Sequence, residues 1–221
     1  MNAALKASKG EETRAVILDE GLRIASRLGL EGLTIGTIAD ATGMSKSGLF
    51  AHFGSREGLQ LAVLEHGARQ FASHVVEPVL SLERGLPRLR AMFTKWVGWT
   101  IASGLPGGCI LISAAHEYDD RPGPIRDAVA GMQRRGLSVI ARAVNLSIEA
   151  GHLRASTDPE QFAFEMMGLV LVAHHHGRLL GDTDAATRAL AAFDALVDRY
   201  ATSTATIRPA DSAAPRSRRA S

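Results

Sequence analysis

The chain lacks the features of a disulfide-bonded or membrane-spanning protein. Its 221 residues include one cysteine, Cys109, so it can form neither an internal disulfide nor a cage of several thiolates around a metal. No run approaches the ~18 uncharged apolar residues of a membrane helix, and the charged start lacks the apolar stretch of a signal peptide. We therefore expect a cytoplasmic protein with no membrane partner, and we predict no cofactor.

Apart from its last 14 residues, the chain has no excess of basic residues. It also lacks the alternating pattern that is typical of β-strands. Residues 208 to 221 hold four arginines against one aspartate, which leaves 21 basic and 22 acidic residues elsewhere. Net charge is therefore weak evidence for a nucleic-acid partner. No segment alternates apolar and polar residues between hairpin turns. With 46% hydrophobic residues, the chain is predicted to be all-α with a packed core.

Common catalytic motifs do not occur. The sequence has no G-x-S-x-G elbow, no P-loop, no H-E-x-x-H and no G-x-G-x-x-G. Gly104, Gly107 and Gly108 follow no predicted strand, so they are interpreted as part of a turn. We predict that the chain is not an enzyme, and an all-helical enzyme is the alternative.

Helix start and stop residues divide the chain into short segments. Apolar spacing predicts a helix over 13–28, Thr34 caps a second helix that Gly43 ends, and Ser45 caps a third that runs to about His52. Further helices are predicted at 57–72, 87–103, 109–118, 124–150, 158–180 and 184–201. We expect a helix-turn-helix domain at 1–56, a helical domain at 57–202 and a disordered tail at 203–221. The tail arginines either contact phosphates or only keep the chain soluble.

The stretch from Thr34 to Leu59 reads TIGTIADATGMSKSGLFAHFGSREGL, two short helices joined by a glycine-containing turn. In a helix-turn-helix, the second helix places its first residues at base edges in the major groove. Lys46 can donate to guanine or phosphate, and Gly48 lets the backbone approach the duplex. Thr34 and Arg56 lie near helix N-termini, where phosphates bind. The alternative is a compact three-helix unit with no role in DNA binding.

These residues resemble the signature of the tetracycline-repressor family over about residues 12 to 62. The family reads roughly Ser-Lys-Gly-Thr-Leu-Tyr, an aromatic pair and a Ser-Lys-Glu-x-Leu helix start. This chain has Ser-Lys-Ser-Gly-Leu-Phe-Ala-His-Phe and Ser-Arg-Glu-Gly-Leu. Phe50 replaces a tyrosine that often meets a phosphate, and Ala51 and His52 replace the polar–aromatic pair. The residues predicted to contact DNA are Thr34, Ser45, Lys46, Ser47, Gly48, Phe50, His52, Phe53 and Arg56.

The resemblance implies a ligand-responsive transcription regulator, most often a repressor. Such a protein binds a palindromic operator in double-stranded DNA as a homodimer and leaves it when a small-molecule effector binds. Symmetry supports the dimer independently, because a module that reads ~3 to 4 base pairs binds weakly, whereas a two-fold dimer engages two half-sites. A sequence-indifferent DNA-coating protein is a further alternative, and it would need a broad basic face.

An effector site is expected in the helical domain. Phe93, Trp96 and Trp99 recur at spacing three on one predicted helix, and residues 109 to 118 are expected to form a second wall. Aromatic and sulfur-bearing walls suit an apolar or aromatic effector. The residues predicted to bind it are Phe71, Phe93, Trp96, Trp99, Cys109, His116 and Tyr118. Ordinary core packing of the aromatics and a solvated helix end at residues 116 to 120 are the alternatives.

The last two predicted helices carry apolar stripes that suit a dimer interface. The residues assigned to it are Phe162, Met166, Leu169, Val170, Ala173, Phe193, Leu196 and Val197. The alternative is that these residues form the core of a single chain.

Two further features have open interpretations. Cys109 senses oxidants or electrophiles if the start of its helix stabilises the thiolate, or else it is a buried, inert thiol. The run His174, His175 and His176 looks like a metal site, but consecutive helical side chains point ~100° apart and do not converge on one ion. A pH-sensitive dimer seam is the other interpretation of this run.

Overall fold

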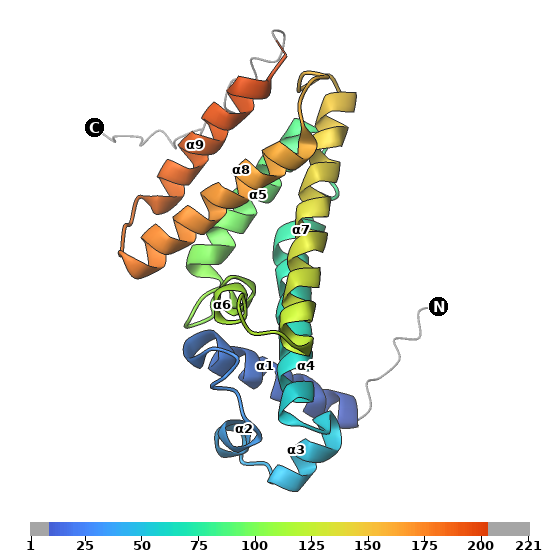
Figure 1. Cartoon of the computed structure of the whole chain (residues 1–221), viewed down its shortest axis with the longest axis vertical. Helices are drawn as coiled ribbons and strands as arrows, with labels where there is room; N and C mark the ends of the chain where they lie inside the picture. The colour runs from blue at the N-terminus through green and yellow to red at the C-terminus, as the bar shows by residue number, and fades with distance from the viewer. Residues whose placement is uncertain (1–8, 203–221) are drawn as a thin grey trace, which may run out of the picture.

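The computed structural model describes residues 9–202, which form an all-α chain (Figure 1). Within this range no strand forms, apart from a single bridge between Leu153 and Ala201. The tail predicted for residues 203–221 lies outside the described residues. The elements are α1 (Lys9–Leu28), α2 (Ile35–Thr42), α3 (Lys46–Phe53), α4 (Arg56–Phe71), η1 (Ala72–Val76), η2 (Glu77–Val79), α5 (Leu86–Ala102), α6 (Ile110–Glu117), α7 (Pro124–Glu149), α8 (Pro159–His174), η3 (His175–Leu179) and α9 (Ala185–Tyr200).

Local capping residues set the ends of the first short helices. Thr34 and Thr37 form a reciprocal capping box at the start of α2, with the Thr37 N–H donating to the Thr34 hydroxyl at 3.0 Å. Gly43 ends α2 with φ +69°, a left-handed conformation that glycine adopts without steric cost. Ser45 then caps α3, accepting from the Gly48 N–H at 3.1 Å. These boundaries match those predicted from the sequence because each signal acts over a few residues.

Two apolar clusters hold the helices together. The first lies among α1 to α4, with side chains from α6 and from the beginning of α7 completing it. The second lies among α5, α7, α8 and α9, where the rings of Phe93 and Phe193 stack 4.2 Å apart and Phe162 meets Phe193 edge-on. Figure 1 shows the first cluster's helices at one end of the molecule and the second cluster's helices at the other.

Two helices run between the ends. In Figure 1, α4 and α7 extend along the long axis and pack against each other. The first half of α4 contributes Leu59, Val63 and Leu64 to the first cluster, whereas its last residue, Phe71, packs against the second. A movement of α4 therefore reaches both ends of the molecule. Over residues 9–202 no helix has the length and apolarity required to cross a bilayer.

Candidate DNA interface and effector cavity

The outer face of α3 presents polar and aromatic side chains to solvent. Leu49 is fully buried and fixes the helix on the first cluster, whereas Lys46, Ser47 and Phe50 are exposed, Phe50 by 57%. Lys46 makes no ion pair within residues 9–202, so its ammonium is available to an outside acceptor. Ser47 is within 3.2 Å of the Ser45 hydroxyl. This helix can therefore offer donors and one apolar ring to a duplex groove.

Two other residues that are predicted to contact DNA, His52 and Phe53, are only partly exposed. Phe53 is half-buried against the first cluster, and the Arg14 guanidinium lies 5.2 Å from its ring centroid. The His52 ring is 6.1 Å from that of Phe53 and is also partly buried. The end of α3 thus contributes packing as well as surface.

The Arg56 side chain is exposed but bonded within the chain. Its guanidinium pairs with the Glu31 carboxylate at 2.9 Å and donates to the backbone carbonyl oxygens of Glu31 and Leu33. Thr34 likewise uses its hydroxyl in the α2 cap. Arg56 therefore meets a phosphate only if the duplex competes with its pairing to Glu31. The first-turn N–H groups of the two helices are the remaining donors there.

A cavity of about 290 Å³ opens between α4, α5, α6 and α7. Its wall is almost entirely apolar. Phe71, Trp96 and Cys109, three of the predicted effector residues, line it. The other lining residues are Ala68, Ala72, Val75, Val76, Met92, Leu111, Ile112, Val129, Met132, Gln133, Arg135, Gly136, Val139, Ile140 and Met167.

The remaining predicted effector residues do not line this cavity. Phe93 is fully buried in its stack with Phe193, and Trp99 lies behind Phe71, its ring 6.3 Å from that of Phe71. Tyr118 packs into the first cluster, and His116 lines a different hollow, between α6, the end of α8 and η3. The cavity thus brings together three of the seven predicted residues and not the other four, because spacing three places residues along a helix without deciding which neighbours they meet.

Cys109 is the N-terminal cap residue of α6 and is buried in the cavity wall. Burial raises the pKa of its thiol because an apolar environment disfavours the thiolate. This direction is opposite to the one that activates a cysteine. The geometry favours the inert, apolar interpretation of this thiol.

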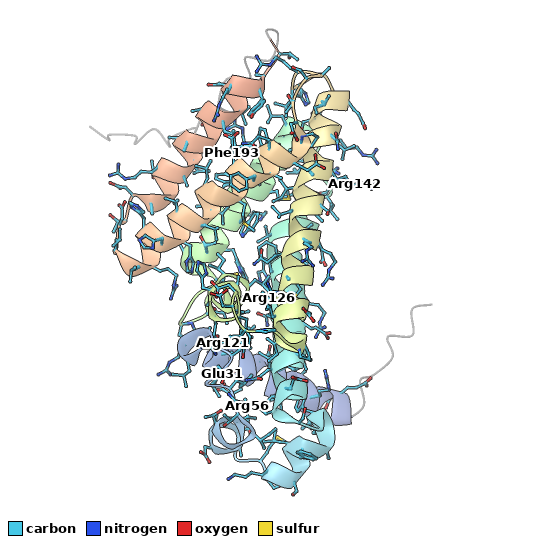
Figure 2. The ribbon with its side chains drawn as sticks, in the orientation of Figure 1. Glu31, Arg56, Arg121, Arg126, Arg142 and Phe193 are labelled. Atoms are coloured by element: carbon cyan, nitrogen blue, oxygen red, sulfur yellow. The ribbon has the colours of Figure 1, made fainter. Side chains whose placement is uncertain are left out.

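The end of α6 is bonded to the turn between α1 and α2. The Glu117 carboxylate accepts the N–H groups of Leu30 and Glu31, each at 2.8 Å. Beside it, the Tyr118 hydroxyl donates to Glu31 at 2.8 Å, and Arg121 lies 4.0 Å from the same carboxylate. Figure 2 shows Glu31, Arg56 and Arg121 gathered at this junction. The Glu31 carboxylate thus connects Tyr118, at the end of α6, with Arg56 in the first turn of α4.

Charge, burial and hydrogen bonding at this junction shift the pKa values of Glu31 and Tyr118. The Tyr118 hydrogen bond, with Arg56 and Arg121, holds the pKa of Glu31 below its usual 4.5. Burial, and then the Glu31 carboxylate, raises the pKa of Tyr118. Both shifts favour a neutral phenol that donates to an ionised carboxylate.

The stripes assigned to a dimer interface face inward. Phe162, Met166, Val170 and Ala173 of α8, and Phe193, Leu196 and Val197 of α9, are all buried within one chain, and Leu169 is partly buried. Seven of these eight side chains are buried in the core of the single chain, as the internal-core alternative expects, whereas Leu169 keeps partial exposure. The outward side of α8 and η3 instead carries Phe164, Leu171, Val172, Leu179 and Leu180, which are exposed by 36 to 73%.

Sequence reasoning missed several residues that the structure brings together. Met132, Gly136 and Ile140 recur at spacing four on α7, so one face of that helix was a detectable signal for the cavity. Glu31 follows the turn at Gly29, and nothing near it in the sequence indicates its partners 25 and 87 residues away.

The chain matches known families along most of its length. The family model "Bacterial regulatory proteins, tetR family" matches residues 17–63, and "Tetracyclin repressor-like, C-terminal domain" matches residues 85–193. The "HTH-type transcriptional repressor AcnR" of Corynebacterium glutamicum is 36% identical over 69 residues. That match covers 31% of this chain, and the chain spans only 37% of that relative's length.

Solved structures share the fold. A TetR-family transcriptional regulator from Cytophaga hutchinsonii superposes with a TM-score of 0.78 at 20% identity, over 89% of this chain and 98% of that one. AibR, solved in complex with isovaleryl coenzyme A and operator DNA, superposes with a TM-score of 0.62 at 24% identity, over 84% and 96%. At these identities the likeness establishes the all-α architecture and its two parts.

Proposed function

The chain belongs to the tetracycline-repressor family of bacterial regulators, and from this we propose that it is a ligand-responsive transcription repressor acting on a palindromic operator. The observation that supports this best is α3, which is fixed by the buried Leu49 and presents the unpaired Lys46 beside two serines. Such a helix fits the major groove with its first residues at base edges. We place the protein in the cytoplasm, where its DNA target lies.

Contacts to the duplex divide into two kinds in this proposal. Lys46, Ser47 and Phe50 meet base edges, where a lysine can donate to guanine and an aromatic ring can touch the thymine methyl group. Ser45 and Gly48 lie at the start of the same helix, and Thr34 lies at the start of α2. The positive ends of these two helices are suited to phosphates, which position a protein without specifying sequence.

The effector is a compact apolar or aromatic molecule bound in the cavity between α4 and α7. The wall offers Phe71, Trp96 and several methionine and branched side chains, which favour apolar surface. Gln133 already donates to the Leu111 carbonyl at 2.8 Å, so Arg135 is the polar lining group best placed to meet a polar end of the ligand. AibR, bound to isovaleryl coenzyme A, supports an effector in a member of this fold.

Two helices, α4 and α6, couple the effector cavity to the DNA-recognition helix α3. Residues at the start of α6 line the cavity, whereas Glu117 at its end is bonded to the α1–α2 turn. Phe71 at the end of α4 also lines the cavity, and Arg56 at its start meets Glu31 beside the reader. A ligand that displaces either helix changes the position of α3. By linkage, DNA and ligand then weaken each other reciprocally, typically by ~1 to 3 kcal/mol.

A homodimer is formed through the outer face of α8 and η3. Phe164, Leu171, Val172, Leu179 and Leu180 are exposed there at helical spacing, and grouped exposed apolar residues mark association surfaces. A two-fold interface through this face holds the α3 helices of the two chains at a fixed separation. This separation determines the half-site spacing of the operator.

Fluorescence anisotropy tests the proposal directly. The purified chain is titrated onto labelled duplexes tiled across the DNA flanking its gene, at physiological salt and with scrambled competitor. Competitor-resistant binding to one palindromic fragment is the expected result. Uniform binding with a steep salt dependence and no preferred fragment would contradict it and favour a DNA-coating protein.

The effector part has its own readout. Both tryptophans of the chain lie on α5, and Trp96 lines the cavity. A bound apolar compound should therefore change the intrinsic fluorescence and release the labelled operator over the same concentration range. A compound that changes fluorescence without moving the anisotropy would contradict the coupling but not the cavity.

A further inference from the structure

A second hollow lies along α6 and shares the wall residue Ile112 with the effector cavity. It measures about 530 Å³ and is bounded by α6, by the end of α8 and by η3. Four of its lining residues, which we call the His/Arg cluster, carry nitrogen donors: His116, His174, His175 and Arg178. Ile112, Leu171 and Leu179 supply apolar wall beside them.

The cluster contains donors that the chain does not use. The Nε2 atom of His174 is buried and has no hydrogen-bond partner. His116 already uses its Nδ1–H, which donates to the Ile112 carbonyl at 2.9 Å, so the unused donors come from His174, His175 and Arg178. Arg178 donates from one terminal nitrogen to the Pro106 carbonyl at 2.7 Å and keeps its other N–H groups. A buried, unpaired nitrogen is costly, so a bound acceptor would satisfy it.

In the part of the chain that the structure describes, the charge of Arg178 has no ion-pair partner at this place. Within residues 9–202 no carboxylate forms an ion pair with any member of the cluster. Glu117 lines the hollow, but its oxygens accept the N–H groups of Leu30 and Glu31. Asp182 pairs with His176 and Arg188. Burial, and then the charges of Arg178, His116 and His175, lower the pKa of His174, as expected where cations gather without an anion.

A metal does not explain the cluster. In the described part of the chain no group of three or more His, Cys, Asp or Glu side chains is arranged to hold an ion. An arginine among the lining residues also disfavours a cation, since a guanidinium stays charged. The complementary ligand is an anion with several acceptor oxygens.

We propose that the His/Arg cluster binds the phosphate group of a small metabolite. A phosphate offers several oxygens to donors that arrive from two elements, and arginine is well suited to it. The neighbouring Ile112 would contact the organic part of the molecule. The hollow shares Ile112 with the effector cavity and borders the proposed dimer face at Leu171 and Leu179, but it contains no residue of α2 or α3. Its test therefore needs no operator.

Isothermal titration with inorganic phosphate in a chloride buffer tests the site. The wild-type chain is expected to bind one phosphate per chain, saturably. Arg178→Gln should raise the dissociation constant about tenfold, in keeping with the loss of a charge-assisted hydrogen bond. Arg142→Gln, which removes the same charge from the exposed side of α7 (Figure 2), should leave it unchanged.

A second variant keeps the test independent of folding. Arg178 also contacts the loop at Pro106, whereas His175 is exposed and makes no hydrogen bond that its replacement would break. His175→Gln should therefore weaken phosphate binding in a chain of unaltered melting temperature. Absence of saturable binding to the wild type, or equal binding by all variants, would overturn the proposal. Acetate that binds as tightly as phosphate would overturn the phosphate assignment.

Discussion

At the residue scale, Lys46 is the side chain on which recognition should depend most. It is exposed at the first position of α3 and has no ion-pair partner within residues 9–202. Its neighbours on the same turn, Ser45 and Gly48, bond to each other and set the start of the helix. Specificity is therefore concentrated in a side chain whose removal costs the fold little.

Lys46→Ala should weaken operator binding by ~1 to 3 kcal/mol if the lysine reads a base, and evenly across sequences if it meets a phosphate. Anisotropy on the operator and on single-base variants of it distinguishes the two. Lys95→Ala, an exposed lysine on α5, is the matched control and should leave affinity unchanged. An unaltered affinity in Lys46→Ala would remove this residue from the interface.

Two glycines should respond oppositely to alanine. A Cβ at Gly107 would overlap the backbone carbonyl of Ser26, so Gly107→Ala should destabilise the chain by ~1 to 3 kcal/mol. Gly98, inside α5, has open space around it, so Gly98→Ala should stabilise by up to ~1 kcal/mol. Urea denaturation measures both. A neutral Gly107→Ala would mean that the contact between α1 and the α5–α6 loop is not tight.

At the element scale, α6 connects the cavity directly with the helix-turn-helix domain. Its two turns place cavity residues at one end and Glu117 at the other. A short helix whose ends are both bonded to other elements transmits displacement rather than absorbing it. The junction at Glu31 is the point where this displacement reaches α4.

Glu31→Gln should lower the free energy of unfolding at pH 7 by about 1 kcal/mol, since it weakens the pairing with Arg56 and the hydrogen bond from Tyr118. The folded pKa of Glu31 lies below its usual value. Its stabilisation is therefore present above that usual value and is lost as the pH falls through the folded pKa. The difference between wild type and variant should begin to shrink below about pH 4.5 and should close only below the folded pKa.

Chemical denaturation at pH 7 and pH 4 measures this change. Glu65→Gln is the control, because Glu65 is exposed on α4 and lies 4.0 Å from Arg69 one turn on. Its effect at pH 7 should be below ~0.5 kcal/mol. A constant difference between wild type and Glu31→Gln at both pH values would contradict the role given to the junction.

At the scale of the whole molecule, dimerisation should decide operator affinity. Phe164 is 73% exposed on α8, so a charge there costs a single chain little but would be buried in the dimer. Phe164→Arg should raise the dimer dissociation constant by about thirtyfold, equivalent to about 2 kcal/mol for a central interface residue. Operator binding should weaken with it.

Analytical ultracentrifugation checks the dimer directly. Leu82→Arg, at a leucine that is 42% exposed in the loop before α5, is the control for an added charge on an apolar surface residue. If Phe164→Arg remained as dimeric as the wild type, the outer face of α8 would not be the interface. An operator complex of unchanged affinity would then be expected as well.

The sequence by itself determined where the helices lie and which of them is the DNA-recognition helix. Thr34, Gly43, Ser45 and Ser55 cap or end helices through hydrogen bonds and dihedral angles that involve residues a few positions away. The apolar spacing along each segment likewise follows from the period of a helix. Fold class, helix positions and the helix-turn-helix therefore required no knowledge of distant contacts.

Only the tertiary structure decided which neighbours each face meets. Phe162 and Phe193 form apolar stripes that suit either a core or a dimer, and burial against Phe93 selects the core. Arg56 looks free until Glu31 is placed beside it. In each case the partner lies tens of residues or more away in the chain. Spacing fixes the direction of a side chain on its own helix, whereas packing fixes what lies opposite.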